Sequence, residues 1–268
     1  MTTAYENRYR VAGLKITLDG SAPGRTAWLT KPYLIPPEGQ KAGYAGYPAI
    51  PNTKEVEALI DEAYQKGWPV HVHANGDAAV DQMIAALTPV HAKYPPADRR
   101  TTLIHGVLMR RDQLDTLKDL QVIASLFPMH TYYWGDLYPE TVGPEWAQQI
   151  APIGTALRKG MHVNSHSDSP VALPNLMQGM WATVNRTSRS GKVVGADERL
   201  TPIEGLKAIT LWPAYEIFEE KTKGSIEPGK LADLVILSAN PLTVDPAMIN
   251  QIQVLETIKE GQTVYRRN

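Results

Sequence analysis

The chain contains no cysteine, and this absence excludes two kinds of structure. Neither a disulfide framework nor a thiolate metal site can form, so any metal ion must be held by histidine and carboxylate side chains. Long apolar runs are also missing, because no stretch approaches the length that spans a bilayer, and the N-terminus is polar. These absences argue against a membrane protein and against an uncleaved secretory signal. They are compatible with a cytoplasmic location.

An excess of charge of either sign is missing as well. The formal net charge is −1 and the chain has no long basic run, so nucleic acid is not an expected partner. A chain of 268 residues can bury a large core, either as one α/β domain or as one domain with a small appendage.

Short apolar strands alternate with helical segments along most of the chain, in units of roughly 30 residues. The predicted strands cover residues 11–18, 69–74, 101–105, 122–126 and 161–164. Helices are predicted over residues 53–67, 77–93, 114–120, 152–159, 174–186 and 201–219, with Asp77 placed to cap the second of them. This alternation is typical of successive βαβ crossovers, so we expect an α/β fold with a parallel sheet.

Polar side chains gather at the carboxyl ends of the predicted strands. His71 and His73 lie two residues apart on one strand, so their imidazoles share a face. The complete set is Lys15, Asp19, His71, His73, His105, His130, His166 and Asp168. For either His71 or His73 taken alone, a core or surface role is the favoured interpretation. The recurrence of polar residues at one edge of a parallel sheet, where α/β enzymes keep their chemistry, predicts an active site.

Two long segments and the C-terminus depart from the alternation. Residues 21–51 and 130–144 show no helical or strand period, and long loops of this kind are usually functional. Residues 224–237 form a turn-rich entry to a strand, and residues 254–259 and 262–265 are predicted to pair as a hairpin across Glu260-Gly261. We therefore divide the chain into residues 1–222 and a β-rich portion, residues 223–268.

Several motifs match one enzyme family in order and across nearly the whole chain. They are K-I-T-L-D-G-S with R-T-A (15–27), H-A-N-G-D-A-A-V-D (73–81), L-I-H-G (103–106), S-D-S-P-V (167–171) and G-S-I-E-P-G-K-L-A-D-L-V-I-L (224–237). With these motifs the chain resembles the C-terminal half of the metal-dependent amidohydrolase superfamily. Within it, the chain is most similar to the branch that includes N-substituted formamide deformylases.

The resemblance implies a partial (β/α)8 TIM-type barrel, about its last five βα units, with a portion of a C-terminal β-sandwich. It places Lys15, His73, His105 and Asp168 at the ends of the fourth, fifth, sixth and eighth family strands. His73, His105 and Asp168 would hold one or two divalent ions, with zinc expected. Asp168 would also be catalytic, since it would take a proton from metal-activated water. Lys15 would bridge two ions if carbamylated, and is otherwise a solvated strand-end lysine.

The remaining histidines have two open interpretations each. His71 is either structural or a support for the metal ligands. His130 is expected to contact the substrate or to support the ligands. His166 either orients Asp168 by a hydrogen bond or is a buried structural residue.

The implied activity is hydrolysis of a non-peptide carbon–nitrogen bond in a small amide-type substrate. Two alternatives remain open: a catalytically inert piece with an incomplete site, and a mononuclear deaminase-like enzyme that uses His73, His105 and Asp168. The family's H-x-H pair on its first strand is absent before Lys15, so we expect a fragment that lacks the first three strands. Because an open barrel exposes strand edges, we also expect pairing with a second copy or with a completing chain.

Overall fold

The computed structural model describes residues 4–268, and its central feature is a five-stranded parallel sheet. The strands follow one another in the order β1-β2-β3-β4-β5, and each pair of neighbours is parallel. They are β1 (Leu14–Thr17), β2 (Val70–Gly76), β3 (Thr102–Leu108), β4 (Ile123–Leu126) and β5 (Val163–Ser165). The predicted α/β class and parallel sheet are confirmed.

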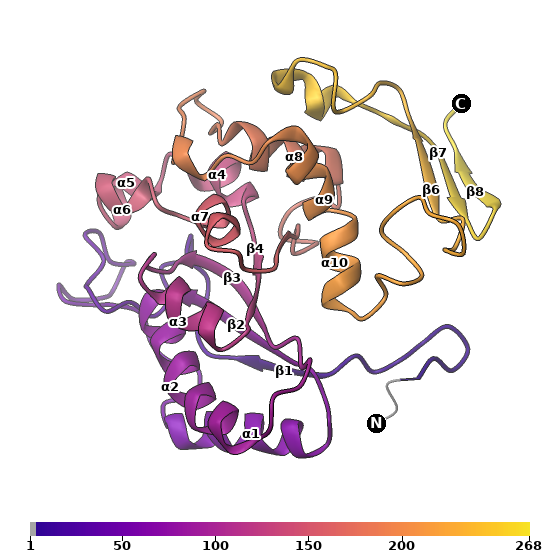
Figure 1. Cartoon of the computed structure of the whole chain (residues 1–268). Helices are drawn as coiled ribbons and strands as arrows, with labels where there is room; N and C mark the ends of the chain where they lie inside the picture. The colour runs from indigo at the N-terminus through magenta and orange to yellow at the C-terminus, as the bar shows by residue number, and fades with distance from the viewer. Residues whose placement is uncertain (1–3) are drawn as a thin grey trace.

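Three amphipathic helices cover one face of this sheet, on the lower left of Figure 1. They are α1 (Thr53–Gln65), α2 (Asp77–Lys93) and α3 (Gln113–Asp119). The side chain of Asn52 accepts a hydrogen bond from the Lys54 amide and so caps α1. The buried apolar stripes of these helices pack against the strands, and this packing forms the main core.

The predicted cap at Asp77 is wrong, because Gly76 occupies the N-cap position of α2. Strand β2 runs through Gly76 directly into the helix, with no turn between them. A Cβ at Gly76 would lie 1.9 Å from the carbonyl oxygen of Trp28, so only glycine fits there. As the first helical residue, Asp77 instead accepts hydrogen bonds from the amide of Thr30 (2.9 Å) and from its hydroxyl.

Residues 21–51 contain no helix or strand, as predicted, but the loop prediction for residues 130–144 is wrong. The chain there forms α4 (Met129–Trp134), α5 (Tyr138–Thr141) and α6 (Pro144–Ala147). Both α5 and α6 carry proline in their first turn, where the missing N–H costs nothing. Tertiary burial of Tyr138 and of other aromatic side chains stabilises these helices, which are too short to show a period.

The helices of the second half are α7 (Ile153–Arg158), α8 (Leu176–Asn185), α9 (Pro202–Ala208) and α10 (Leu211–Glu216). The single helix predicted over residues 201–219 is therefore divided. Thr210 lies between the two parts with φ −132° and ψ −83°, which is not helical. Pro213 follows in the first turn of α10 and has no N–H to continue the ladder of α9. Two short 3₁₀ helices, η1 (Ala196–Glu198) and η2 (Pro246–Gln251), complete this half.

A second, antiparallel sheet lies at the C-terminus and stands apart from the first in Figure 1. Its strands are β6 (Leu234–Leu237), β7 (Val254–Lys259) and β8 (Gln262–Arg266). The predicted hairpin of β7 and β8 is confirmed. Helix α8 packs on η2, where the indole of Trp181 donates to the carbonyl of Ala247 (3.0 Å).

The parallel sheet remains open over residues 4–268, because β1 and β5 are its two edges and each pairs with a single neighbour. The described residues therefore form no closed barrel. In the part of the chain that the structure describes, no helix has the length and apolar character of a membrane span.

Candidate functional site

Three imidazoles from separate segments meet at the carboxyl edge of the parallel sheet. His73 lies on β2, His105 on β3, and His166 directly follows β5. The rings of His73 and His105 have centroids 4.5 Å apart, and those of His105 and His166 are 5.0 Å apart. The structure thus brings together histidines that are 93 positions apart at most, from His73 to His166.

The surroundings of His73 determine which of its nitrogens the protein engages. Its Nε2 lies 3.2 Å from the carbonyl oxygen of Gly20 and 3.3 Å from Oδ1 of Asp19. The side-chain amide of Asn75 also contacts this nitrogen (3.2 Å), and it donates to the carbonyl of Gly20 (2.8 Å). Protein groups therefore engage Nε2 of His73, and among the described residues no hydrogen bond is made to its Nδ1.

Asp19 is a residue whose role the sequence did not reveal. Its buried carboxylate accepts hydrogen bonds from the backbone amides of Trp28 (2.9 Å), Asn75 (2.9 Å) and Gly76 (2.8 Å). These bonds tie the long segment of residues 21–51 to the end of β2, beside His73. The sequence placed Asp19 among the polar residues at the carboxyl ends of the strands, within the K-I-T-L-D-G-S motif, but gave no sign of its partners.

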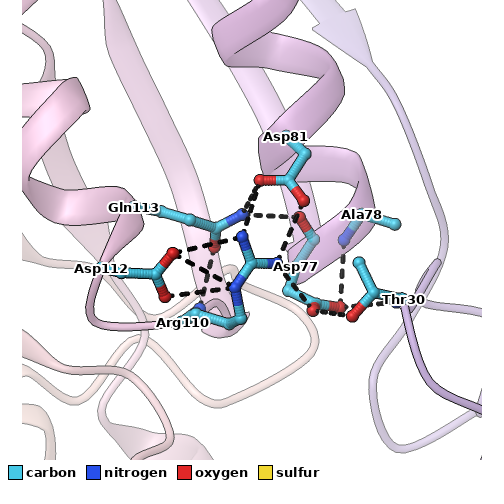
Figure 2. Close-up of polar contacts among 7 residues, drawn as sticks. All are labelled: Thr30, Asp77, Ala78, Asp81, Arg110, Asp112 and Gln113. Carbon is cyan, nitrogen blue, oxygen red and sulfur yellow. Dashed lines mark hydrogen bonds and ion pairs between the residues drawn. The ribbon is translucent and has the colours of Figure 1, made fainter.

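A second polar cluster supports the loops that follow β2 and β3 (Figure 2). The guanidinium of Arg110 pairs with the carboxylates of Asp77 (2.9 Å), Asp81 (3.0 Å) and Asp112 (3.1 Å). These carboxylates raise the pKa of Arg110. Gln113 donates to the backbone carbonyl of Asp77 (2.7 Å). The start of α2 is therefore anchored to the loop that leads into α3.

The local backbone at the site is strained. His105 has φ +80° and Asp168 has φ +49°, a region that side-chain-bearing residues seldom occupy. Such strain persists where the surrounding structure enforces it, and it clusters at functional sites. Burial and the neighbouring imidazoles lower the pKa of His105, and burial lowers the pKa of His166 to about 3. Both rings are therefore neutral near pH 7, and each has a lone pair.

Lys15 lies near enough to the imidazoles for its charge to contribute to the lowered pKa of His105 and of His166. Lys15 pairs in register with His71, not with His73, and it is exposed, whereas the next residue on β1, Ile16, is buried. Desolvation lowers the pKa of Lys15, while the charges of Asp168 and Glu216 oppose this shift. The Asp168 side chain is exposed.

The donor chemistry of the cluster fits a divalent metal, because neutral imidazole and carboxylate are suitable ligands. The arrangement does not supply a complete coordination set. Within residues 4–268, no group of three or more histidine, aspartate or glutamate side chains is placed to hold a metal ion. Asp168 faces solvent, and one nitrogen on each of His73 and His105 is used by a neighbouring group.

The other predicted histidines occupy different surroundings. His71 precedes His73 on β2, and its Nδ1 lies 3.5 Å from Oε1 of Glu216. His130 is buried, and its Nδ1 lies 2.6 Å from the Tyr138 hydroxyl. Burial lowers the pKa of His130 to about 3. His166 faces His105 (3.0 Å between Nε2 and Nδ1) and makes no hydrogen bond to Asp168 among the described residues.

Known proteins resemble this chain in both sequence and fold. The model of the amidohydrolase family matches residues 2–265. The protein YtcJ of Bacillus subtilis (strain 168) is 28% identical over 262 residues, which cover 95% of this chain and 47% of that protein. The N-substituted formamide deformylase of Arthrobacter pascens is 28% identical over 214 residues, which cover 80% of this chain and 39% of that enzyme.

A crystal structure of an uncharacterized metal-dependent hydrolase from Pyrococcus horikoshii OT3 superposes with a TM-score of 0.77 at 28% identity. The match covers 91% of this chain and 47% of that one, so the chain spans about half the length of the relatives that it matches. Because the family match extends over nearly every residue and includes all the strands around the clustered histidines, the chain belongs to the amidohydrolase family.

Proposed function

We propose that this chain carries part of the metal site of an enzyme that hydrolyses a non-peptide carbon–nitrogen bond in a small amide-type substrate. The observation that carries the proposal is the pair of adjacent rings of His73 and His105 at the carboxyl edge of the sheet. One nitrogen of each ring faces a protein group, so the other is left for a ligand. The similarity to an N-substituted formamide deformylase supports this reaction class.

A divalent metal, with zinc expected, would be held by His73, His105 and Asp168 and would acidify a bound water. Lys15 is proposed as a further, bridging ligand for a second ion after carbamylation. Its lowered pKa supports this role, because carbon dioxide reacts with the neutral amine and desolvation favours that form.

The carboxylate of Asp168 acts as the proton carrier in this proposal. It accepts a proton from the attacking water and delivers it to the leaving nitrogen, so that one group serves as base and then as acid. Its exposure at the rim of the sheet leaves it open to solvent and to substrate. The segments over residues 21–51 and 129–147 follow β1 and β4, and we propose that they select the substrate.

The open sheet leads to a proposal about assembly. We infer that its strands form part of a (β/α)8 barrel, in which further strands adjoin the free edges of β1 and β5. A second copy or a completing chain would supply these strands and the remaining metal ligands. Light scattering should therefore give a mass above that of one chain, whereas a monomer mass would contradict pairing.

The function is tested by zinc loading, metal analysis and formate release from an N-substituted formamide. We expect at least one equivalent of zinc in the wild-type protein and its loss in His73→Ala. His91→Ala, on the outer helix α2, is the matched control and should retain both zinc and activity. Asp168→Asn should lose turnover. Less than one equivalent in the wild type would contradict the proposal and support a catalytically inert piece.

A further inference from the structure

A continuous series of hydrogen bonds leads away from His105 through the interior beneath the site. His105 Nδ1 lies 3.0 Å from Nε2 of His166, and Nδ1 of His166 lies 3.2 Å from Oγ of Ser125. The hydroxyl of Ser125 donates to Oδ1 of Asn164 (2.6 Å), and the Asn164 amide donates to Glu216. These five residues come from β3, β4, β5 and α10 and the residue after β5.

The carboxylate end determines the direction of every bond in this series. Glu216 can only accept, so the Asn164 NH₂ group must face it and Oδ1 must face Ser125. Because Oδ1 is only an acceptor, the single hydroxyl hydrogen of Ser125 is used there. The oxygen of Ser125 therefore accepts from Nδ1 of His166, and Nε2 of His166 is left without a hydrogen.

The hydrogen bond between His166 and His105 is the last of the series. Two imidazole nitrogens 3.0 Å apart share one hydrogen, and the bare Nε2 of His166 is the acceptor. The hydrogen therefore lies on Nδ1 of His105. The other nitrogen of His105, Nε2, is the one with an available lone pair.

We propose that Glu216, Asn164, Ser125 and His166 are positioning residues that hold His105 as the Nδ1–H tautomer and present its Nε2 to a metal ion. The Nδ1–H tautomer of His105 depends only on the hydrogen bonds described above. The binding of a metal ion by its Nε2 rests on the proposed function. Partners of this kind orient a ligating histidine and raise its affinity for the metal.

The series is placed to keep its direction. Ser125 and Asn164 are buried and face each other in register across β4 and β5, so water does not compete for them. The ring of His166 stacks on Phe127, with centroids 5.1 Å apart, which restrains its orientation. Glu216 also faces His71 through its second oxygen (3.5 Å). This contact assigns His71 a supporting position at the far end of the series.

The tautomers are measured directly in protein labelled with ¹⁵N-histidine, without metal, by long-range proton–nitrogen correlation. We expect Nδ1–H signals from both His105 and His166 in the wild type. Ser125→Ala removes the hydroxyl and should leave His105 as a mixture of tautomers, whereas Ser125→Thr keeps the hydroxyl and should restore Nδ1–H. An Nε2–H form of His105 in the wild type, or unchanged tautomers in Ser125→Ala, would overturn the proposal.

Zinc affinity provides the second readout. Ser125→Ala and Glu216→Gln should each weaken zinc binding by about 10–100-fold. Ser125→Ala interrupts the series, and in Glu216→Gln the side chain can donate as well as accept, so it no longer fixes the direction of the hydrogen bonds. Glu220→Gln loses the same charge but contacts Arg100 instead, and it should bind as the wild type does. If Ser125→Thr and Ser125→Ala weaken zinc binding equally, Ser125 acts through packing alone and the proposed role of the hydrogen-bond series is refuted. If the wild-type protein binds no zinc, the proposed function fails, while the spectra still test whether the hydrogen-bond series holds His105 as the Nδ1–H tautomer.

Discussion

The substitution Asp19→Asn tests the buried carboxylate that ties the segment of residues 21–51 to the end of β2. We call this group of hydrogen bonds the Asp19 anchor. One oxygen of Asp19 accepts from the amides of Trp28 and Gly76, and the other accepts from Asn75. Asparagine has a single acceptor oxygen, so its NH₂ group must face one of these amides. That buried donor loses its partner at about 1–3 kcal/mol, and the two other bonds lose charge assistance at roughly 1 kcal/mol each. We expect a loss of about 3–5 kcal/mol in the free energy of unfolding.

The measurement is urea unfolding at pH 7, analysed by linear extrapolation. Asp61→Asn is the matched control, because its partner Lys93 is about half exposed and water can replace the contact, so we expect a far smaller change. Asp19→Asn should also weaken zinc binding, since Nε2 of His73 loses a charged neighbour. If Asp19→Asn unfolds within 1 kcal/mol of the wild type, this account of the anchor is refuted.

Three further substitutions test other parts of the structure. Arg186→Met should cost about 3–5 kcal/mol in urea unfolding, because its buried guanidinium donates to three backbone carbonyls; a cost no larger than that of the exposed control Arg189→Met would contradict this. Burial lowers the pKa of His130 from 6.5 to about 3. As the pH falls from 6.5 toward 3, His130 therefore binds a proton in the unfolded chain but not in the folded one, and the free energy of unfolding falls by up to about 1.4 kcal/mol per pH unit. His130→Gln should make that slope shallower in urea titrations at pH 7 and pH 5, and an unchanged slope would count against the burial argument. Gly76→Ala would drive its Cβ against the carbonyl of Trp28 and should lower the thermal midpoint, and a midpoint equal to that of the wild type would show that the loop yields freely.

Much of the framework could be predicted from local pattern. Alternation along β2 places His71 and His73 on one face, and the burial pattern of that strand shows this alternation. Helix α2 covers the same residues, 77–93, as its apolar spacing predicts. These features depend on neighbours a few positions away, so a single sequence contains the information.

The site required more than local pattern. Sequence placed His166 near Asp168, two positions away, but in the structure His166 faces His105, 61 positions earlier. The roles of Asp19 and Glu216 were likewise hidden, since their partners come from strands and loops that folding brings together.

By itself, the sequence determined the parallel α/β framework and the gathering of polar side chains at one edge, because strand period and helix period are properties of adjacent residues. Only the tertiary structure decided which nitrogen of each imidazole is free, because that depends on the donors and acceptors that distant segments place around the ring.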